Sequence, residues 1–294
     1  MELIYNVNQN SYSCVKEVLV SYFKISHRLI TKLKQENAIF LNNMPCFINE
    51  KIYIGDSVRV NLDYAEKTDN IKPTPMPLEI LKETDGYIII NKTANMPVHP
   101  SSNHYSDTLS NGIRSYFDSI GLKKLIRPVN RIDTDTTGIV IFAKNAYIQE
   151  CFIRQMEKNI FKKYYLAVTK GFWENKKGII DKPISRKLGS IMEREVSENG
   201  EKAITYYEVI QESIIKNTKI SILLCKLETG RTHQIRVHLS SMGHPILGDS
   251  LYSGNSNLIN RQALHSYKVD FLDPITNKQE IIEAPIPDDM KIFF

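Results

Sequence analysis

Paired cysteines, a membrane-spanning apolar run and a secretory leader are all missing from this sequence of 294 residues. The four cysteines stand far apart with no C-x-x-C spacing, which argues against a disulfide framework and against a zinc knuckle. The first residues, Met-Glu-Leu-Ile-Tyr-Asn, contain neither the basic nor the apolar segment of a signal peptide. We therefore expect a cytoplasmic protein without a membrane partner.

Internal repeats, low-complexity tracts and a glycine-rich nucleotide loop are also missing. Hydrophobic residues make up 42% of the chain, which is enough for a sizeable core, and the formal net charge is +5. This mild positive charge suits a polyanionic partner without requiring one. The length favours one large domain and one small domain.

Three prolines at alternate positions mark the clearest boundary in the chain, within the segment D-N-I-K-P-T-P-M-P at 69–77. Such spacing favours an extended connector. We predict a small module over residues 1–64, a linker over 65–77 and a second domain over 78–294. In that domain, apolar runs at 87–90, 138–143, 164–168 and 220–227 alternate with helical stretches, one marked by Ile148, Cys151, Phe152 and Met156 and another capped by Ser106. The pattern alone predicts an α/β or α+β domain.

The richest segment runs from 127 to 144 and reads R-P-V-N-R-I-D-T-D-T-T-G-I-V-I-F-A-K. It places Asp133 and Asp135 in a turn that ends at Gly138, before a short run typical of a buried strand. A carboxylate at the edge of such a strand can have its charge and hydrogen bonds set by its surroundings, as catalysis requires. The alternative is a loop salt bridge between Arg131 and Asp133.

This segment resembles the active-site motif of the RluA family of pseudouridine synthases, H-R-L-D-x-x-T-S-G, which here reads N-R-I-D-T-D-T-T-G at 130–138. Three further blocks follow the family's order, at 78–101, 162–168 and 229–252. The resemblance implies an α+β fold: a mixed, largely antiparallel bent sheet, flanked by helices and crossed by an active cleft.

The resemblance also implies roles for individual residues. Asp133 matches the catalytic carboxylate, Arg236 the arginine that pairs with it, and Tyr165 the tyrosine that stacks on the target base and assists proton removal from carbon 5. For Arg236 the alternative is an ordinary strand arginine, and for Tyr165 it is core packing. Isomerising uridine adds and oxidises nothing, so we expect no cofactor.

A stacked uridine must leave its stack before it can enter a cleft. The resemblance gives Arg131 the role of filling the vacated stack, and Asn130 stands where the family has histidine, which loses the aromatic plane. Arg231, in the loop at 229–231, is expected to hold phosphate or backbone. His233, His238 and His244 have spacings that fit no helix face, which disfavours a metal site. We expect Asp135 to be exposed and His99 to form loop hydrogen bonds.

Within the predicted module of residues 1–64, the segment from about residue 13 to 62 resembles the alpha-L (S4-like) RNA-binding module. Ser26 is a good N-cap for a short helix whose apolar face is Leu29, Ile30 and Leu33, followed by a turn at Asn42-Asn43. Arg28 and Lys32 on that helix are expected to contact RNA phosphates, the alternative being a solvated face.

The sequence thus predicts a monomeric RNA pseudouridine synthase. Large-subunit ribosomal RNA is the expected substrate, and transfer RNA is the other possibility. A non-catalytic RNA-binding or ribosome-assembly protein on the same fold is the alternative, but such a protein would be expected to lose Asp133, Tyr165 or Arg236. A nucleoside hydrolase acting on small molecules is disfavoured by the RNA-binding module.

Overall fold

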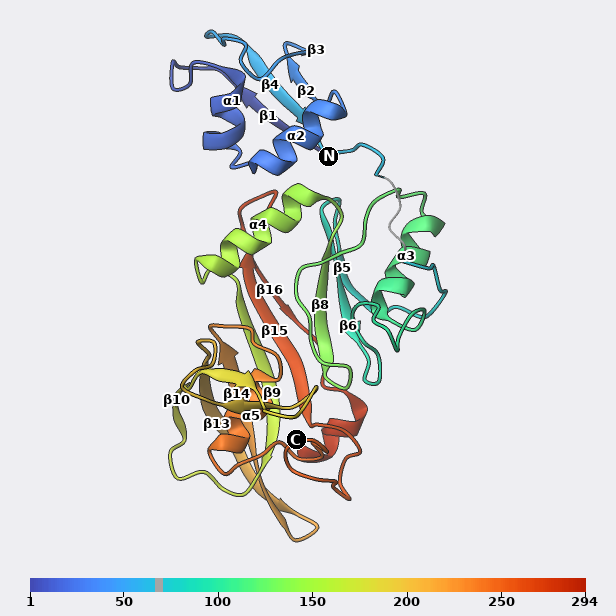
Figure 1. Cartoon of the computed structure of the whole chain (residues 1–294), viewed down its shortest axis with the longest axis vertical. Helices are drawn as coiled ribbons and strands as arrows, with labels where there is room; N and C mark the ends of the chain where they lie inside the picture. The colour runs from blue at the N-terminus through green and yellow to red at the C-terminus, as the bar shows by residue number, and fades with distance from the viewer. Residues whose placement is uncertain (67–70) are drawn as a thin grey trace.

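The computed structural model of the chain describes residues 1–66 and 71–294. Its N-terminal part is an antiparallel four-stranded sheet in the order β1-β4-β2-β3 with helices packed against it, at the top of Figure 1. The elements of this N-terminal module are β1 (Glu2–Asn6), α1 (Val15–Glu17), the π-helix η1 (Val18–Tyr22), α2 (His27–Gln35), β2 (Ile39–Leu41), β3 (Met44–Pro45) and β4 (Ser57–Asn61).

Helix α2 begins as its sequence predicts. The Ser26 hydroxyl accepts a hydrogen bond from the Leu29 backbone N–H, and Leu29, Ile30 and Leu33 are buried. The predicted turn between β2 and β3 is also present, with Asn42 and Asn43 both in the left-handed region. Asparagine tolerates this conformation better than most residues, which makes the Asn-Asn pair a good turn signal.

A ten-stranded sheet dominates the rest of the molecule, in the order β10-β13-β14-β9-β15-β8-β6-β5, with β16 beside β15 and β7 beside β8. Among the strands of the described residues, only the β15–β8 pair is parallel, so the expected mixed, largely antiparallel sheet is confirmed. The strands are β5 (Ile80–Glu83), β6 (Tyr87–Lys92), β7 (Arg127–Pro128), β8 (Thr137–Ala143), β9 (Lys162–Lys170), β10 (Lys177–Asp181), β13 (Ile204–Ile215), β14 (Thr218–Leu227), β15 (Leu264–Leu272) and β16 (Gln279–Glu283). A separate two-stranded ribbon consists of β11 (Ile184–Arg186) and β12 (Arg194–Val196).

Helices cover both faces of this sheet, and they are α3 (Leu109–Ser119), α4 (Ala146–Glu157), α5 (Gln234–Ser241) and the 3-10 helix η2 (Asp288–Phe293). Alternate residues of β6 go to opposite sides: Ile88 and Ile90 pack in the cluster beneath α3, whereas Tyr87 and Ile89 pack in the cluster beneath α4. Because both faces of the strand are buried, its sequence reads as an uninterrupted apolar run.

Two details differ from the sequence predictions. Helix α3 is capped by Thr108 rather than Ser106, because the Thr108 backbone is extended and its N–H donates to Asn111 Oδ1 at 3.1 Å. Asp135 is half-buried, not exposed.

The predicted linker lies only partly within the described residues, because 67–70 fall outside them. From residue 71 onward the chain lies against α3. The Asn111 amide donates to the Lys72 carbonyl at 2.8 Å, and Met76 packs against Gly112. The described end of the linker is therefore packed rather than free, and the domain boundaries stay predictions.

All four cysteines are free. Among the helices of the described residues, none combines the length and the apolar character that a bilayer crossing requires.

Candidate active site

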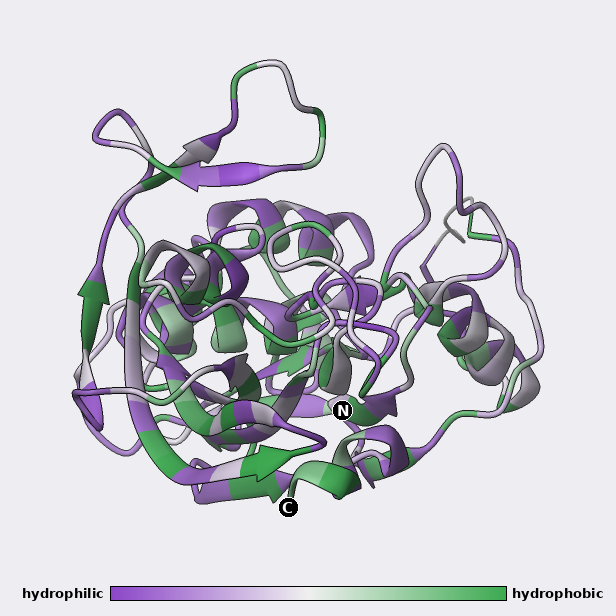
Figure 2. Cartoon of the chain, turned by 90° about the horizontal axis from the view of Figure 1, so that it is seen from below, coloured by the Kyte–Doolittle hydropathy of each residue, from purple (hydrophilic) through white to green (hydrophobic). Residues whose placement is uncertain are grey.

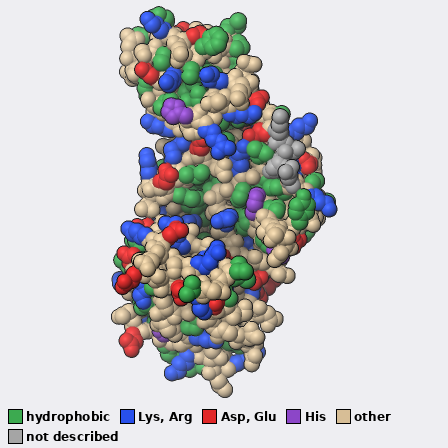
Figure 3. All heavy atoms as spheres, viewed as in Figure 1, with side chains coloured by type: hydrophobic (Ala, Val, Ile, Leu, Met, Phe, Trp, Pro, Cys, Tyr) green, Lys and Arg blue, Asp and Glu red, His purple; other side chains and the backbone are tan. Residues whose placement is uncertain are grey.

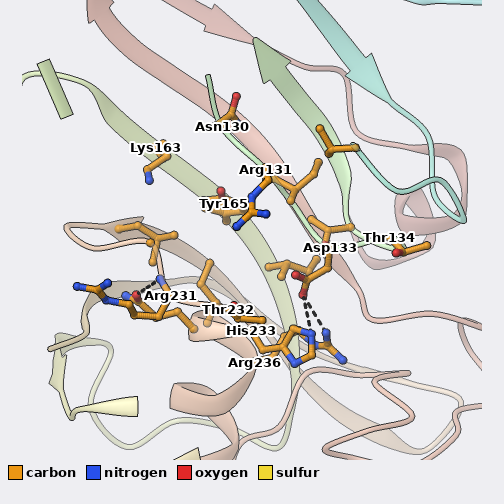
Figure 4. Close-up of a pocket in the computed structure, with 18 of the residues that line it drawn as sticks. Asn130, Arg131, Asp133, Thr134, Lys163, Tyr165, Arg231, Thr232, His233 and Arg236 are labelled. Atoms are coloured by element: carbon orange, nitrogen blue, oxygen red, sulfur yellow. Dashed lines mark hydrogen bonds and ion pairs between the residues drawn. The ribbon is translucent and has the colours of Figure 1, made fainter. Parts of the chain in front are cut away.

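A cavity of about 610 Å³ opens where the two halves of the large sheet meet. Its walls come from the loop before β8, from β9 and from the loop before α5 (Figure 4). The predicted residues Asn130, Arg131, Asp133, Tyr165, Arg231 and Arg236 all line it.

Gly138 lies where the parallel pair of β8 and β15 joins the two halves of the large sheet. Its φ of +104° lies in the left-handed region, and a Cβ here would come within 2.3 Å of the Ser266 carbonyl oxygen. Only glycine therefore lets β8 start so close to β15. The close approach fixes the Asp133 loop, which immediately precedes β8, at the junction.

Two buried basic side chains hold this loop by its backbone. Lys92 Nζ donates to the Thr134 carbonyl at 2.8 Å, and an Arg261 Nη donates to the Asp135 carbonyl at 3.1 Å. Burial lowers the pKa of Lys92 to about 7. The carbonyls on either side of the loop's centre are thus fixed, which orients Asp133.

The Asp133 carboxylate receives a hydrogen bond of 2.8 Å from an Arg236 Nη. The remainder of that guanidinium grips Asp249 in a two-pronged pair, at 2.7 and 2.9 Å. Although burial alone would lower the pKa of Arg236, its hydrogen bond with Asp249 and the charges of both carboxylates raise it. The fully buried Asp249 holds two nitrogens of the guanidinium and so positions the arginine. The third nitrogen is left for Asp133, which is partly exposed.

Arg236 lies on helix α5, not on a strand. The alternative that it is an ordinary strand arginine was therefore wrong about its secondary structure. His233, the residue just before α5, caps this helix in the left-handed conformation with a φ of 57°. The start of α5 thus places both His233 and Arg236 beside Asp133.

A second chain of contacts reaches Asp133 through His233. The Tyr252 hydroxyl lies 3.1 Å from His233 Nδ1, and His233 Nε2 lies 3.9 Å from Asp133 Oδ2. The same hydroxyl accepts the Arg194 backbone N–H at 2.8 Å, so its own proton is free to go to Nδ1. Burial lowers the pKa of His233, which favours a neutral ring with its Nε2–H toward Asp133.

Tyr165 comes from β9 and faces the same cavity. Burial raises its pKa to about 12, and the nearby Asp133 charge acts in the same direction. The phenol is therefore neutral near pH 7 and suits stacking or hydrogen bonding better than proton abstraction. Lys163, two residues earlier on the same strand face, also lines the cavity, and burial lowers its pKa.

The predicted RNA-binding residues differ in how they are held. Arg131 is exposed, and Figure 4 shows its side chain directed toward Tyr165. It makes no ion pair with Asp133 in the structure, so the alternative of a loop salt bridge between them was wrong. Asn130 is buried, and its amide bonds the β8 backbone at Ile139 and Ile141, at 3.0 and 2.9 Å. This geometry gives Asn130 a structural role, and its contact with RNA stays a prediction.

The remaining predicted contacts lie farther out. Arg231 pairs with Glu201 and donates to the Lys202 carbonyl at 3.0 Å, at the rim of the cavity. On α2, Arg28 is exposed, whereas Lys32 pairs with Glu36 at 2.5 Å. Their binding of RNA stays a prediction.

The histidines of the third motif have separate surroundings. His238 is buried against Thr205, and His244 stacks on Trp173, whereas His233 faces Asp133. No cluster of three or more His, Cys, Asp or Glu side chains suited to a metal occurs within 1–66 and 71–294. His99 forms a loop hydrogen bond with Ser110 at 3.3 Å, as expected.

Sequence reasoning assigned no catalytic role to Asp249, Tyr252 or Arg261. Asp249 carried a usable signal, because it directly follows the apolar run Ile246-Leu247-Gly248, which favours burial. A buried carboxylate needs a cation as its partner. Tyr252 and Arg261 carried none, since their partners lie far away in the sequence.

A carboxylate held by a positioned arginine, across an open cleft from a buried tyrosine on a bent mixed sheet, defines the site of an enzyme. The chain matches the family model described as RNA pseudouridylate synthase over residues 86–241. It belongs to the RNA pseudouridine synthase family, and it is an isomerase that acts on uridine in RNA.

Relatives extend this match to nearly the whole chain. An uncharacterized RNA pseudouridine synthase of Bacillus subtilis, YhcT, is 38% identical over 99% of this chain and 95% of its own length. The ribosomal large subunit pseudouridine synthase D of Nitrosomonas europaea is 34% identical, over 87% of this chain and 76% of its own. The solved structure of human RNA pseudouridylate synthase domain containing 1 is similar in fold, with a TM-score of 0.60 and 24% identity over 71% of this chain and 83% of its own.

Proposed function

We propose that this protein isomerises one or more uridines of large-subunit ribosomal RNA, with Asp133 as the catalytic carboxylate. The observation that carries the proposal is the Arg236 clamp: a permanent cation, fixed from behind by Asp249, meets Asp133 at 2.8 Å inside an open cavity. The ribosomal target is supported by relatives named ribosomal large subunit pseudouridine synthase D at 30–34% identity.

The reaction requires a group that tolerates positive charge on the sugar. Asp133, as a nucleophile or as a counter-ion, stabilises the ribose carbon while its bond to uracil N1 breaks. The detached uracil, which carries the electron pair, turns until carbon 5 faces the sugar. The new carbon–carbon bond then forms, carbon 5 loses its proton, and N1 gains one. The product therefore has the same atomic composition as uridine.

The surrounding residues position the base. Tyr165, neutral and buried, offers a ring for the extruded uracil to stack on. Arg131 is exposed at the mouth of the same cavity, where its guanidinium plane suits the gap that the flipped nucleotide leaves. The non-catalytic alternative has no support here, because Asp133, Tyr165 and Arg236 converge on one cavity.

The N-terminal module is part of the same proposal. We assign it an alpha-L-like role in RNA binding, through Arg28 and the other exposed cations of α2. Figure 3 shows lysine and arginine side chains on one face, from this module to the middle of the molecule. A monomer working in the cytoplasm is the form we propose.

Pseudouridine mapping of total RNA, from cells with and without the gene, tests the proposal. We expect one or a few large-subunit positions to lose the modification, and a wild-type copy but not Asp133→Asn to restore it. A loss confined to transfer RNA would correct the substrate. Full restoration by the Asn variant would remove Asp133 from the chemistry.

A further inference from the structure

The ribbon of β11 and β12 lies at the upper left of Figure 2, and its residues Ile184 and Val196 pack in a cluster with Val237 of α5. Its register places Arg186 directly opposite Arg194. Like charges at facing positions of a strand pair destabilise the pair. The two arginines of the ribbon therefore repel each other, and an anion between their guanidinium groups would relieve that repulsion.

A second cavity, of about 440 Å³, lies where these arginines project. Arg186, Arg194 and Arg231 line it, and Glu201 is the only carboxylate among its lining residues. The loop at 230–232 borders this cavity and the catalytic one alike. A strand leaving the catalytic cleft over that loop would enter a groove with an excess of positive charge.

The ribbon is also connected to the catalytic carboxylate. The Arg194 backbone N–H donates to the Tyr252 hydroxyl at 2.8 Å, and that hydroxyl contacts His233, which faces Asp133. An anion that fixes the ribbon would thereby fix one of the two contacts that reach Asp133.

From this geometry we infer that the groove binds a backbone phosphate of the substrate RNA, close to the flipped uridine, through Arg186 and Arg194. The inference rests on the proposed function, since it concerns the same RNA. Guanidinium groups suit phosphate because they offer two parallel N–H donors. The Arg186 side chain makes no hydrogen bond or ion pair within the described residues, and its guanidinium is thus available for this contact. One Arg194 Nη donates to the Met192 and Glu193 carbonyls, which leaves the other nitrogens of that guanidinium for the phosphate.

Equilibrium binding tests the site in an Asp133→Asn background, which prevents turnover. The probe is a transcript spanning a position that the wild-type enzyme converts. We expect Arg186→Gln to raise Kd at least about tenfold, as for the loss of a hydrogen bond to a charged group. The salt slope should fall by about 0.7, the value for one single-strand phosphate.

Lys187→Gln is the matched control. It makes the same charge change one residue away, but Lys187 pairs with Glu193 at 3.0 Å and does not line the groove. Its Kd should stay within twofold of the parent value. Arg186→Gln should not lower Tm, because it removes a repulsion; a fall in Tm together with Kd would indicate a structural role and overturn the inference.

Methylphosphonate linkages then locate the phosphate. Neutralising one linkage next to the target uridine should weaken binding to the parent protein but not further weaken binding to Arg186→Gln. If every linkage weakens both proteins equally, or if Arg186→Gln binds like the parent, there is no phosphate site here. Because the transcript is one that the enzyme converts, such a result leaves the proposed function intact.

Discussion

Asp133 shares its arginine with a carboxylate that has no access to solvent. Asp249 takes two prongs of Arg236 and is fully buried, whereas Asp133 takes one and keeps an open side toward the cavity. A carboxylate held by a single prong retains an oxygen for the substrate. Asp249 is thus a positioning residue, and in the proposed reaction Asp133 is the group that meets the ribose.

The first prediction concerns Asp133→Asn. The amide keeps the shape of the side chain but cannot carry the negative charge that the ribose carbon needs. We expect the single-turnover rate to fall at least about a thousandfold, or roughly 4 kcal/mol of barrier, with Kd for RNA within a few-fold of wild type. Quenched-flow assays of pseudouridine formation measure this, and a rate above that limit would contradict the assignment.

His265 gives the second prediction. Burial lowers its pKa to about 4. Between pH 6.5 and 4, His265 therefore binds a proton in the unfolded chain but not in the folded protein. The resulting stability is present above pH 6.5 and is lost as the pH falls toward 4, by about 3 kcal/mol in total.

Urea unfolding at a series of pH values measures that loss, with His265→Gln as the comparison. Glutamine does not titrate, and it retains a polar group near Thr137, which His265 contacts at 2.8 Å. The wild-type curve should fall more steeply than the variant's between pH 6.5 and 4. Parallel curves would mean that His265 is protonated alike in both states.

Helix α4 is the element that joins the two parts of the molecule. Glu150 accepts hydrogen bonds from both the backbone N–H and the hydroxyl of Ser26, at 3.2 and 2.5 Å. Arg154, one turn later, donates to the Lys24 carbonyl at 3.0 Å. A carboxylate at the start of α2 also complements that helix's positive end. The module is therefore held at the start of α2.

The third prediction is that Glu150→Ala loosens this helix without changing the chemistry. Amide exchange at the start of α2 should become faster, and KM for RNA should rise several-fold, with the saturated single-turnover rate unchanged. Glu157→Ala, an exposed position at the end of the same helix, is the control and should change neither. A variant with unaltered exchange and KM would show that Glu150 does not hold the module.

Sequence patterns predicted the elements better than their contacts. The apolar runs located β6, β8, β9 and β14, because buried strands need continuous apolar residues. The resemblance paired Arg236 with Asp133, and the structure has this contact, but the helix that carries Arg236 was missed. Ser106 and Thr108 are both suitable caps by residue type, and the backbone geometry decided for Thr108. The Glu150–Ser26 contact joins residues 124 apart, and no local pattern predicts such a pair.

At the scale of the whole molecule, the module and the catalytic domain share a core. The buried apolar residues of the module and those beneath α4 form one continuous cluster, from Val7 and Leu33 through Ile141 to Phe152. Lys124, which is buried, also donates to the Leu62 and Tyr64 carbonyls at 3.2 and 2.5 Å. The module and the cleft are thereby held in a fixed relation.

The last prediction is that the module contributes binding rather than chemistry. Deleting residues 1–64 should raise KM for RNA and flatten the salt slope by about two or three units, because each phosphate contact contributes about 0.7–0.9. The shared cluster adds a second expectation: the truncated protein should have a lower Tm, since it exposes the apolar surface beneath α4. Single-turnover rates at saturating RNA should stay largely intact while the core is folded.

A full-length variant separates these two effects. Arg28→Gln with Lys34→Gln removes two exposed cations of α2 and leaves the cluster untouched. It should reproduce part of the change in salt slope, about one to two units, at an unchanged Tm. If this variant binds RNA with the wild-type slope, the cations of α2 are only a solvated face, and the truncation acts through stability alone. A fall in its saturated rate would instead mean that the module helps to form the active cleft.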